Sequence, residues 1–149
     1  MRVTGSRNAA VVLFAIMSVA PCFAHHMAVV VSKQNGVTTL TSAQLRRIFR
    51  AETRKWPHGR TIQLVLHKAS GGEAVTLEHL NNMTAQQWHD WVAEHKDSLI
   101  LVDSDDDVLN YVQSEPKAVG LVDVRSVNDH VNIVRINGRV PMEAGYLPH

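Results

Sequence analysis

Short apolar runs alternate with amphipathic stretches along the chain, and this alternation predicts the fold class. Runs rich in valine, isoleucine and leucine that are bounded by polar residues are typical of strands. They occupy Met27–Val31, Ile62–Leu66, Leu99–Val102, Ala118–Val122 and Val131–Ile136. Helical patterns separate most of these runs. Strands that alternate with helices indicate an α/β fold in which helices flank a central sheet.

Capping patterns mark the starts of the predicted helices. Thr41 is followed three residues later by Gln44, and Thr84 by Gln87, which is the spacing of a capping box. Ser104 precedes a run of aspartates, whose charge favours the positive end of a helix. Apolar residues then recur at helical spacing and predict three buried faces. These are Leu45, Ile48 and Phe49; Trp88, Trp91 and Val92; and Val108, Leu109 and Val112.

Charge is distributed unevenly, although the chain is close to neutral as a whole. The stretch from Lys33 to Lys68 holds eight Lys/Arg against the single acid Glu52, whereas from Ala69 onward thirteen Asp/Glu face five Lys/Arg. Four arginines lie on the first predicted helix and its exit loop: Arg46, Arg47, Arg50 and Arg54. Such a surface can meet an anion, an acidic partner or an anionic lipid surface. The alternative is an ordinary solvated face.

The segment His67–Gly72 is the best candidate for a binding site. It follows the predicted strand Ile62–Leu66 and precedes an apolar-periodic segment, Val75–Leu80. A loop of small residues that opens a helix leaves backbone N–H groups without intrahelical partners, and the helix dipole favours anions at that end. The pattern therefore fits an oxyanion site, and it also fits a plain helix-entry turn.

Two blocks of sequence resemble a known family. The first reads L-T-x-x-x-L-x-x-I-F, a basic loop and W-P-x-G over Leu40–Gly59, and a strand follows. In the second, Val108–Val112 leads through Pro116 to Ala118–Val122, which fits the pattern A-[IV]-G-[YL]-[IV]. From Val29 to Ile136 the chain is thus similar to the phosphate-type periplasmic substrate-binding proteins of ABC transporters, especially their short stand-alone members. The resemblance implies a single type II periplasmic-binding-protein-like lobe with a central mixed sheet.

The resemblance also implies a ligand and a set of residues that bind it. In this family a Ser-Gly-Thr loop binds phosphate, and an arginine lies a few residues before it. Ser70 and Gly71 match this loop, while Gly72 replaces the threonine and removes a hydroxyl donor. Leu66 or a neighbour takes the arginine position, so Lys68 is the nearest cation, and it offers a point charge rather than a bidentate fork. The expected ligand is phosphate or a similar oxyanion, and the expected partner is a membrane transporter.

The chain departs from the family in two respects. Full-length members have two lobes that close on the ligand, and this chain supplies little more than one. A single lobe is expected to bind phosphate weakly or not at all, because affinity depends on groups from both lobes and on excluding water. The family's helix exit commonly reads F-x-G, and Ala51 replaces that glycine, so we expect a different local backbone. The rival hypothesis is a lobe without ligand that docks on a membrane sensor or transporter component through the four arginines.

Residues 1–24 are typical of a signal peptide. Two arginines precede an apolar run that is short for a bilayer span, and Cys22-Phe23-Ala24 offers small residues at the cleavage point. A retained membrane anchor is the alternative. Cleavage after Ala24 would remove the only cysteine and give a periplasmic protein. We expect one domain, 25–149, with a short C-terminal tail, 138–149.

Other chemistries lack their characteristic patterns. The sequence has no nucleophile elbow, no Cys–His pair and no nucleotide-type phosphate loop, so we expect neither an enzyme nor a cofactor. Nucleic acid is disfavoured as a partner, because no aromatic stacking pattern accompanies the positive charge. A mature chain that begins at His25 would offer copper an N-terminal histidine. The other histidines have no ligand spacing, and we expect no metal site.

Overall fold

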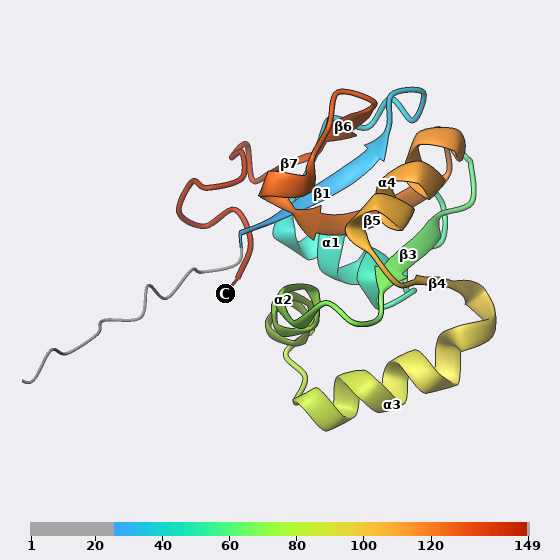
Figure 1. The fold of residues 1–149 in the computed structure, drawn as a ribbon, viewed down its shortest axis with the longest axis vertical. Helices are drawn as coiled ribbons and strands as arrows, with labels where there is room; N and C mark the ends of the chain where they lie inside the picture. Colours follow the sequence, from blue (N-terminus) through green and yellow to red (C-terminus); the bar gives the residue numbers. More distant parts are fainter. Residues whose placement is uncertain (1–25, 149) are drawn as a thin grey trace, which may run out of the picture.

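The computed structural model describes residues 26–148, which form a mixed five-stranded sheet with helices on both faces (Figure 1). The sheet consists of β1 (Met27–Ser32), β3 (Gln63–His67), β4 (Leu99–Val102), β5 (Ala118–Asp123) and β6 (Val131–Ile133). The helices are α1 (Ser42–Phe49), α2 (Gly71–Asn81), α3 (Ala85–His95) and α4 (Asp105–Ser114). Two short strands, β2 (Thr39–Leu40) and β7 (Arg135–Ile136), form a separate parallel pair.

The strand order of the sheet is β4-β3-β5-β1-β6. Strand β3 runs parallel to both β4 and β5, whereas β1 runs antiparallel to both β5 and β6. The expected α/β fold with a central mixed sheet and flanking helices is therefore confirmed. Because β3, β4 and β5 are mutually parallel, their carboxyl ends lie at one edge of the sheet. The loops that follow His67, Val102 and Asp123 meet there.

The side chains of the strands point alternately to the two faces of the sheet, and a separate hydrophobic core lies on each face. In β1, Val29 and Val31 belong to the larger core with α1 and α2, while Val30 belongs to the smaller core with α4. Successive strand residues point to opposite faces, so a continuous apolar run serves both layers. Two of the predicted helix faces are buried as expected: Leu45, Ile48 and Phe49 on α1, and Val108, Leu109 and Val112 on α4. On α3 only Trp88 is buried, whereas Trp91 and Val92 are half-buried against the larger core.

The predicted helix caps are present. In α1, Thr41 Oγ1 accepts from the Gln44 amide at 3.1 Å and Gln44 Oε1 accepts from the Thr41 amide at 2.8 Å. The same reciprocal pair joins Thr84 and Gln87 at the start of α3. Ser104 Oγ accepts from the third residue of α4 at 3.0 Å. These bonds satisfy donors that a helix cannot pair internally.

Helix α1 ends in a left-handed residue that is not glycine. Ala51 has φ 56°, its amide donates to the Ile48 carbonyl, and the next amide, of Glu52, donates to the Arg47 carbonyl. This pair of bonds is a Schellman motif, which usually carries glycine at its left-handed position. The bonds thus hold alanine in a conformation that glycine favours.

The C-terminal part of the domain differs from the sequence prediction in detail. The predicted strand Val131–Ile136 divides at Val134, whose amide donates to the Val29 carbonyl, so that β6 extends the sheet and β7 pairs with β2. The predicted tail packs into the larger core through Tyr146 and Leu147. The Tyr146 hydroxyl donates to the Val134 carbonyl at 2.7 Å and accepts from the Val29 amide at 3.1 Å.

The predicted signal peptide, residues 1–24, lies outside the described residues. Within residues 26–148, no helix combines the length and apolarity that a membrane crossing requires.

Candidate functional site

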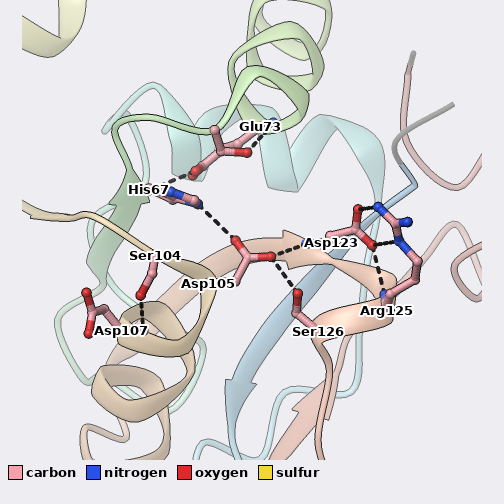
Figure 2. A network of polar contacts seen from close by, with 9 residues as sticks. His67, Glu73, Ser104, Asp105, Asp107, Asp123, Arg125 and Ser126 are labelled. Carbon is pink, nitrogen blue, oxygen red and sulfur yellow. Dashed lines mark hydrogen bonds and ion pairs between the residues drawn. The ribbon is translucent and has the colours of Figure 1, made fainter. Parts of the chain in front are cut away.

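The candidate site lies at the edge where the three parallel strands end (Figure 2). His67 closes β3 and a short loop leads to α2, while Asp105 opens α4 after β4. Asp123 closes β5. In open α/β sheets, ligands commonly bind outside the carboxyl ends of the strands. The polar side chains of this edge therefore define the site.

Asp105 joins the three strand ends. Its Oδ1 lies 2.9 Å from His67 Nδ1, so a ring with its proton on Nδ1 donates to the carboxylate. Its Oδ2 accepts from the Asp123 amide at 3.0 Å and from Ser126 Oγ at 2.8 Å. One carboxylate thus connects the ends of β3 and β5 to the start of α4. Hydrogen bonds to a charged acceptor are among the stronger ones in proteins.

Glu73 is an acid buried in the first turn of α2, with 2% of its surface exposed. Its Oε2 accepts from the His67 amide at 2.8 Å, and its Oε1 has no hydrogen-bond partner among the described residues. Burial raises the pKa of this carboxyl well above its ordinary value of 4.5, and the nearby Asp105 adds to the rise, against the opposing hydrogen bond from His67. The site therefore contains a carboxyl that favours its protonated form.

The predicted oxyanion residues lie together at the start of α2. Ser70 is the N-cap, and its hydroxyl accepts from the Glu73 amide at 3.1 Å. Gly71 is exposed and Gly72 half-buried, and within residues 26–148 the amides of both lack a hydrogen-bond acceptor. Lys68 Nζ lies 3.0 Å from Asp103 Oδ1, and both side chains are exposed. The loop thus offers two unpaired amides and a lysine that already has a solvated partner.

The predicted basic surface is a separate feature. All four of its arginines are exposed, and two of them also make local contacts. Arg50 Nε lies 3.4 Å from Glu52 Oε1, and Arg54 Nε donates to the Ala51 carbonyl at 3.3 Å. Lys68, Ser70 and Glu73 line a cavity of about 390 Å³, and none of the four arginines lines it. The structure therefore does not combine the two predicted sets into one site.

Sequence reasoning missed the polar network around Asp105. It interpreted Asp105 as part of a helix start and did not consider Glu73 or Ser126 as site residues. A usable pattern was present, because His67, Asp103 and Asp123 each end or follow a predicted strand. Within residues 26–148, no group of three His, Cys, Asp or Glu side chains is arranged to hold a metal ion.

Comparisons with known proteins give matches in three-dimensional structure but not in sequence. No protein-family model matches the chain, and no curated protein matches it. The fold is similar to that of an ABC-type phosphate transport receptor from Vibrio cholerae, with a TM-score of 0.63 and 22% identity over 78% of this chain and 48% of that one. It is also similar to a phosphate ABC transporter substrate-binding protein with bound phosphate from Clostridium perfringens (TM-score 0.63, 20% identity, 76% and 45%).

A third similar structure is PstS from Borrelia burgdorferi, with a TM-score of 0.63 and 18% identity over 78% of this chain and 49% of that one. The chain spans less than half the length of each of these three proteins. At these identities the likeness shows the fold alone. The chain has the fold of one periplasmic-binding-protein lobe, similar to that of phosphate-binding proteins.

Proposed function

We propose that this chain is an exported, single-lobe oxyanion-binding protein that takes phosphate or a similar oxyanion at the start of α2 and serves a membrane transporter. The observation that carries the proposal is the pair of unpaired amides at Gly71 and Gly72, at the carboxyl edge of three parallel strands. Such amides and the helix dipole favour an anion. The similar folds belong to proteins whose names specify phosphate transport or phosphate binding. The sequence pattern of residues 1–24, typical of a signal peptide, supports export.

Weak binding is expected for two reasons. The carboxylates of Asp103 and Asp105 lie at the same edge and oppose an anion. Residues 26–148 form one lobe, which by itself leaves the proposed ligand open to water.

Titration with inorganic phosphate tests the proposal. The Ser70, Gly71 and Gly72 amide resonances should shift, and the free energy of unfolding should rise by about 2.7 kcal/mol at a hundredfold excess over the dissociation constant. Sodium chloride at matched ionic strength controls for screening of the basic surface. Equal responses to phosphate and chloride would exclude an oxyanion site at this loop.

Two variants separate the site from general electrostatics. Lys68→Ala should weaken phosphate binding, whereas Lys96→Ala, which removes an exposed lysine outside the cavity, should leave it unchanged. Gly71→Asp should abolish binding by repulsion. It should also fold normally, because the space around Gly71 is open and an acid suits the start of a helix.

A second candidate function is docking on an acidic protein surface through α1. Arg46 and Arg47 are exposed on this helix, outside the cavity, which favours a role separate from the ligand. A polyglutamate peptide serves as the probe, and it should shift the α1 amides in a salt-dependent way. The effect should vanish in the Arg46→Glu, Arg47→Glu double variant and persist in the control Arg135→Glu. Equal, weak shifts at every surface cation would show a solvated face instead.

A further inference from the structure

The cavity beside the proposed oxyanion site is larger and more apolar than phosphate requires. Its volume of about 390 Å³ falls in the range of roughly 300–1,000 Å³ that is typical of pockets for organic ligands. Leu66 of β3, Leu77 of α2, Trp88 and Val92 of α3 and Leu101 of β4 form its apolar wall. Inorganic phosphate has no apolar group to place against this wall.

The polar end and the apolar wall belong to one cavity. Lys68, Ser70 and Glu73 line it together with the apolar residues, so a single ligand can reach both parts. Glu73 supports a ligand in this cavity independently of the unpaired amides at the start of α2. Its side chain is buried, it lines the cavity, and its Oε1 lacks a partner within residues 26–148. A buried polar atom without a partner is costly, and a ligand that pairs with it removes that cost.

The apolar wall also reaches the surface. Leu101 lies on β4, the edge strand of the sheet, and 37% of its surface is exposed. Trp88 lies deeper and stacks on Trp91 with ring centroids 5.1 Å apart. The cavity thus leads from an exposed leucine to a buried indole, and burial of an apolar group there is favourable.

We propose that the ligand is an organic phosphate, an alkyl or aryl phosphate monoester, whose phosphate group binds at Lys68, Ser70 and the Gly71–Gly72 amides and whose apolar group occupies this cavity. This inference rests on the proposed oxyanion function and specifies the class of ligand. The Glu73 carboxyl, when protonated, is placed to donate a hydrogen bond from the floor of the cavity.

Calorimetric titration with three probes tests the inference: phenyl phosphate, inorganic phosphate and benzyl alcohol. Phenyl phosphate should bind at least tenfold more tightly than inorganic phosphate and should change the tryptophan fluorescence, because Trp88 lines the cavity. Benzyl alcohol, which carries the apolar group without the phosphate, should bind much more weakly than phenyl phosphate.

A matched pair of variants locates the apolar group. Leu101→Asp should remove the advantage of phenyl phosphate, measured as the ratio of its affinity to that of inorganic phosphate, because the added charge repels both ligands and cancels in the ratio. Val75→Asp is the control, because Val75 is a similarly exposed apolar residue, at 45%, that does not line the cavity. The Val75→Asp variant should retain the full advantage in affinity of phenyl phosphate over inorganic phosphate.

The outcomes distinguish failure of this inference from failure of the proposed function. Equal affinities for the two phosphates, or no effect of Leu101→Asp, would overturn the organic ligand and leave the oxyanion site standing. Binding of neither phosphate would overturn both. Binding of benzyl alcohol as tight as that of phenyl phosphate would show that the phosphate group adds nothing to binding in this cavity. It would overturn the organic phosphate, while the result with inorganic phosphate would still decide the proposed function.

Discussion

The end of α1 holds Ala51 in a strained backbone conformation. Its φ of 56° lies in the left-handed region, where a residue with a Cβ pays roughly 1–2 kcal/mol. Glycine adopts this region freely but loses more entropy on folding. The Ala51 backbone is held by the bonds that end α1.

We therefore expect Ala51→Gly to raise the free energy of unfolding by roughly 0.5–1 kcal/mol, measured by urea denaturation. Ala93→Gly is the matched control. It lies at an exposed position within α3 and should cost about 1 kcal/mol, because glycine lowers helix propensity. Destabilisation of both variants by the same amount would contradict the strain at Ala51.

Glu73 should make stability depend on pH. Its pKa in the folded protein is raised above the unfolded value by burial, so the folded state holds its proton more tightly. The contribution of this group to stability is fully present below the unfolded pKa, near 4.5, and is lost as the pH rises through the folded pKa. Each unit of difference between the two pKa values is worth about 1.4 kcal/mol.

Glu73→Gln should remove this loss, since the amide stays neutral and its oxygen can still accept from the His67 amide. The difference in unfolding free energy between variant and parent should therefore grow in favour of the variant from pH 4.5 to pH 8, as followed by denaturant titration. A difference that stays constant across this range would show that Glu73 does not titrate differently on folding.

Local residue patterns predict part of the site and miss the rest for a physical reason. The caps at Thr41, Thr84 and Ser104 depend on neighbours three residues away, so the sequence contains all the necessary information. The contacts of Asp105 with His67 and Ser126 depend on the order of strands in the sheet. The sequence shows that polar residues follow the strands, but no local pattern reports the strand order, and the contacts among these residues are therefore visible only in the structure.

At the scale of elements, the packing of α4 on the sheet depends on a glycine, Gly120 of β5, which has no side chain. A Cβ added to Gly120 in β5 would lie 2.6 Å from Val108 Cγ1 and 3.6 Å from Val112 Cγ2 on α4. Both valines are fully buried and branched, so they have little freedom to move. The glycine thus permits the close approach of helix and strand.

Gly120→Ala should destabilise the protein by roughly 1–3 kcal/mol, because α4 must shift outward, and thermal unfolding measures the change. The double variant with Val108→Ala should show a favourable coupling, since the contacting methyl group is gone. Gly71→Ala is the control and should be neutral or stabilising, because a Cβ there meets nothing within 4 Å. Additive effects of Gly120→Ala and Val108→Ala would contradict the clash.

Predictability also differs between elements. The strands Leu99–Val102 and Ala118–Asp123 agree closely with the sequence prediction, because their apolar runs are bounded by polar residues. The two-residue strand β2 was missed, since Thr39 and Leu40 are too few to show any periodicity. Their pairing with β7 comes from a segment nearly one hundred residues further along the chain.

At the scale of the whole molecule, hydrogen bonds of Tyr146 connect the C-terminal segment to the sheet. Its buried hydroxyl connects the Val29 amide to the Val134 carbonyl, and burial raises the pKa of the phenol to about 12. Removal of this hydroxyl leaves a buried donor and a buried acceptor unpaired. Removal of a hydrogen-bond partner in a buried site costs about 1–3 kcal/mol.

Tyr146→Phe should therefore lower the free energy of unfolding by about 1–3 kcal/mol without changing the fold. Circular dichroism checks the secondary structure, and hydrogen exchange of the Val29 amide reports the local effect. Tyr111→Phe is the control, because Tyr111 is only half-buried and should tolerate the change. Unchanged exchange at Val29 would show that the hydroxyl does not hold this amide.

The placement of β1 has a consequence for the timing of folding. This strand is the first element of the described chain, yet it pairs only with β5 and β6, close to the other end. Contacts between distant parts of a chain cost closure entropy and form slowly. A ribosome that has released only the first hundred residues has supplied β1 with no strand partner. The sheet can therefore be completed only after the chain has been synthesised as far as β6, so the helices α1 and α2 have to wait for the layer on which they pack.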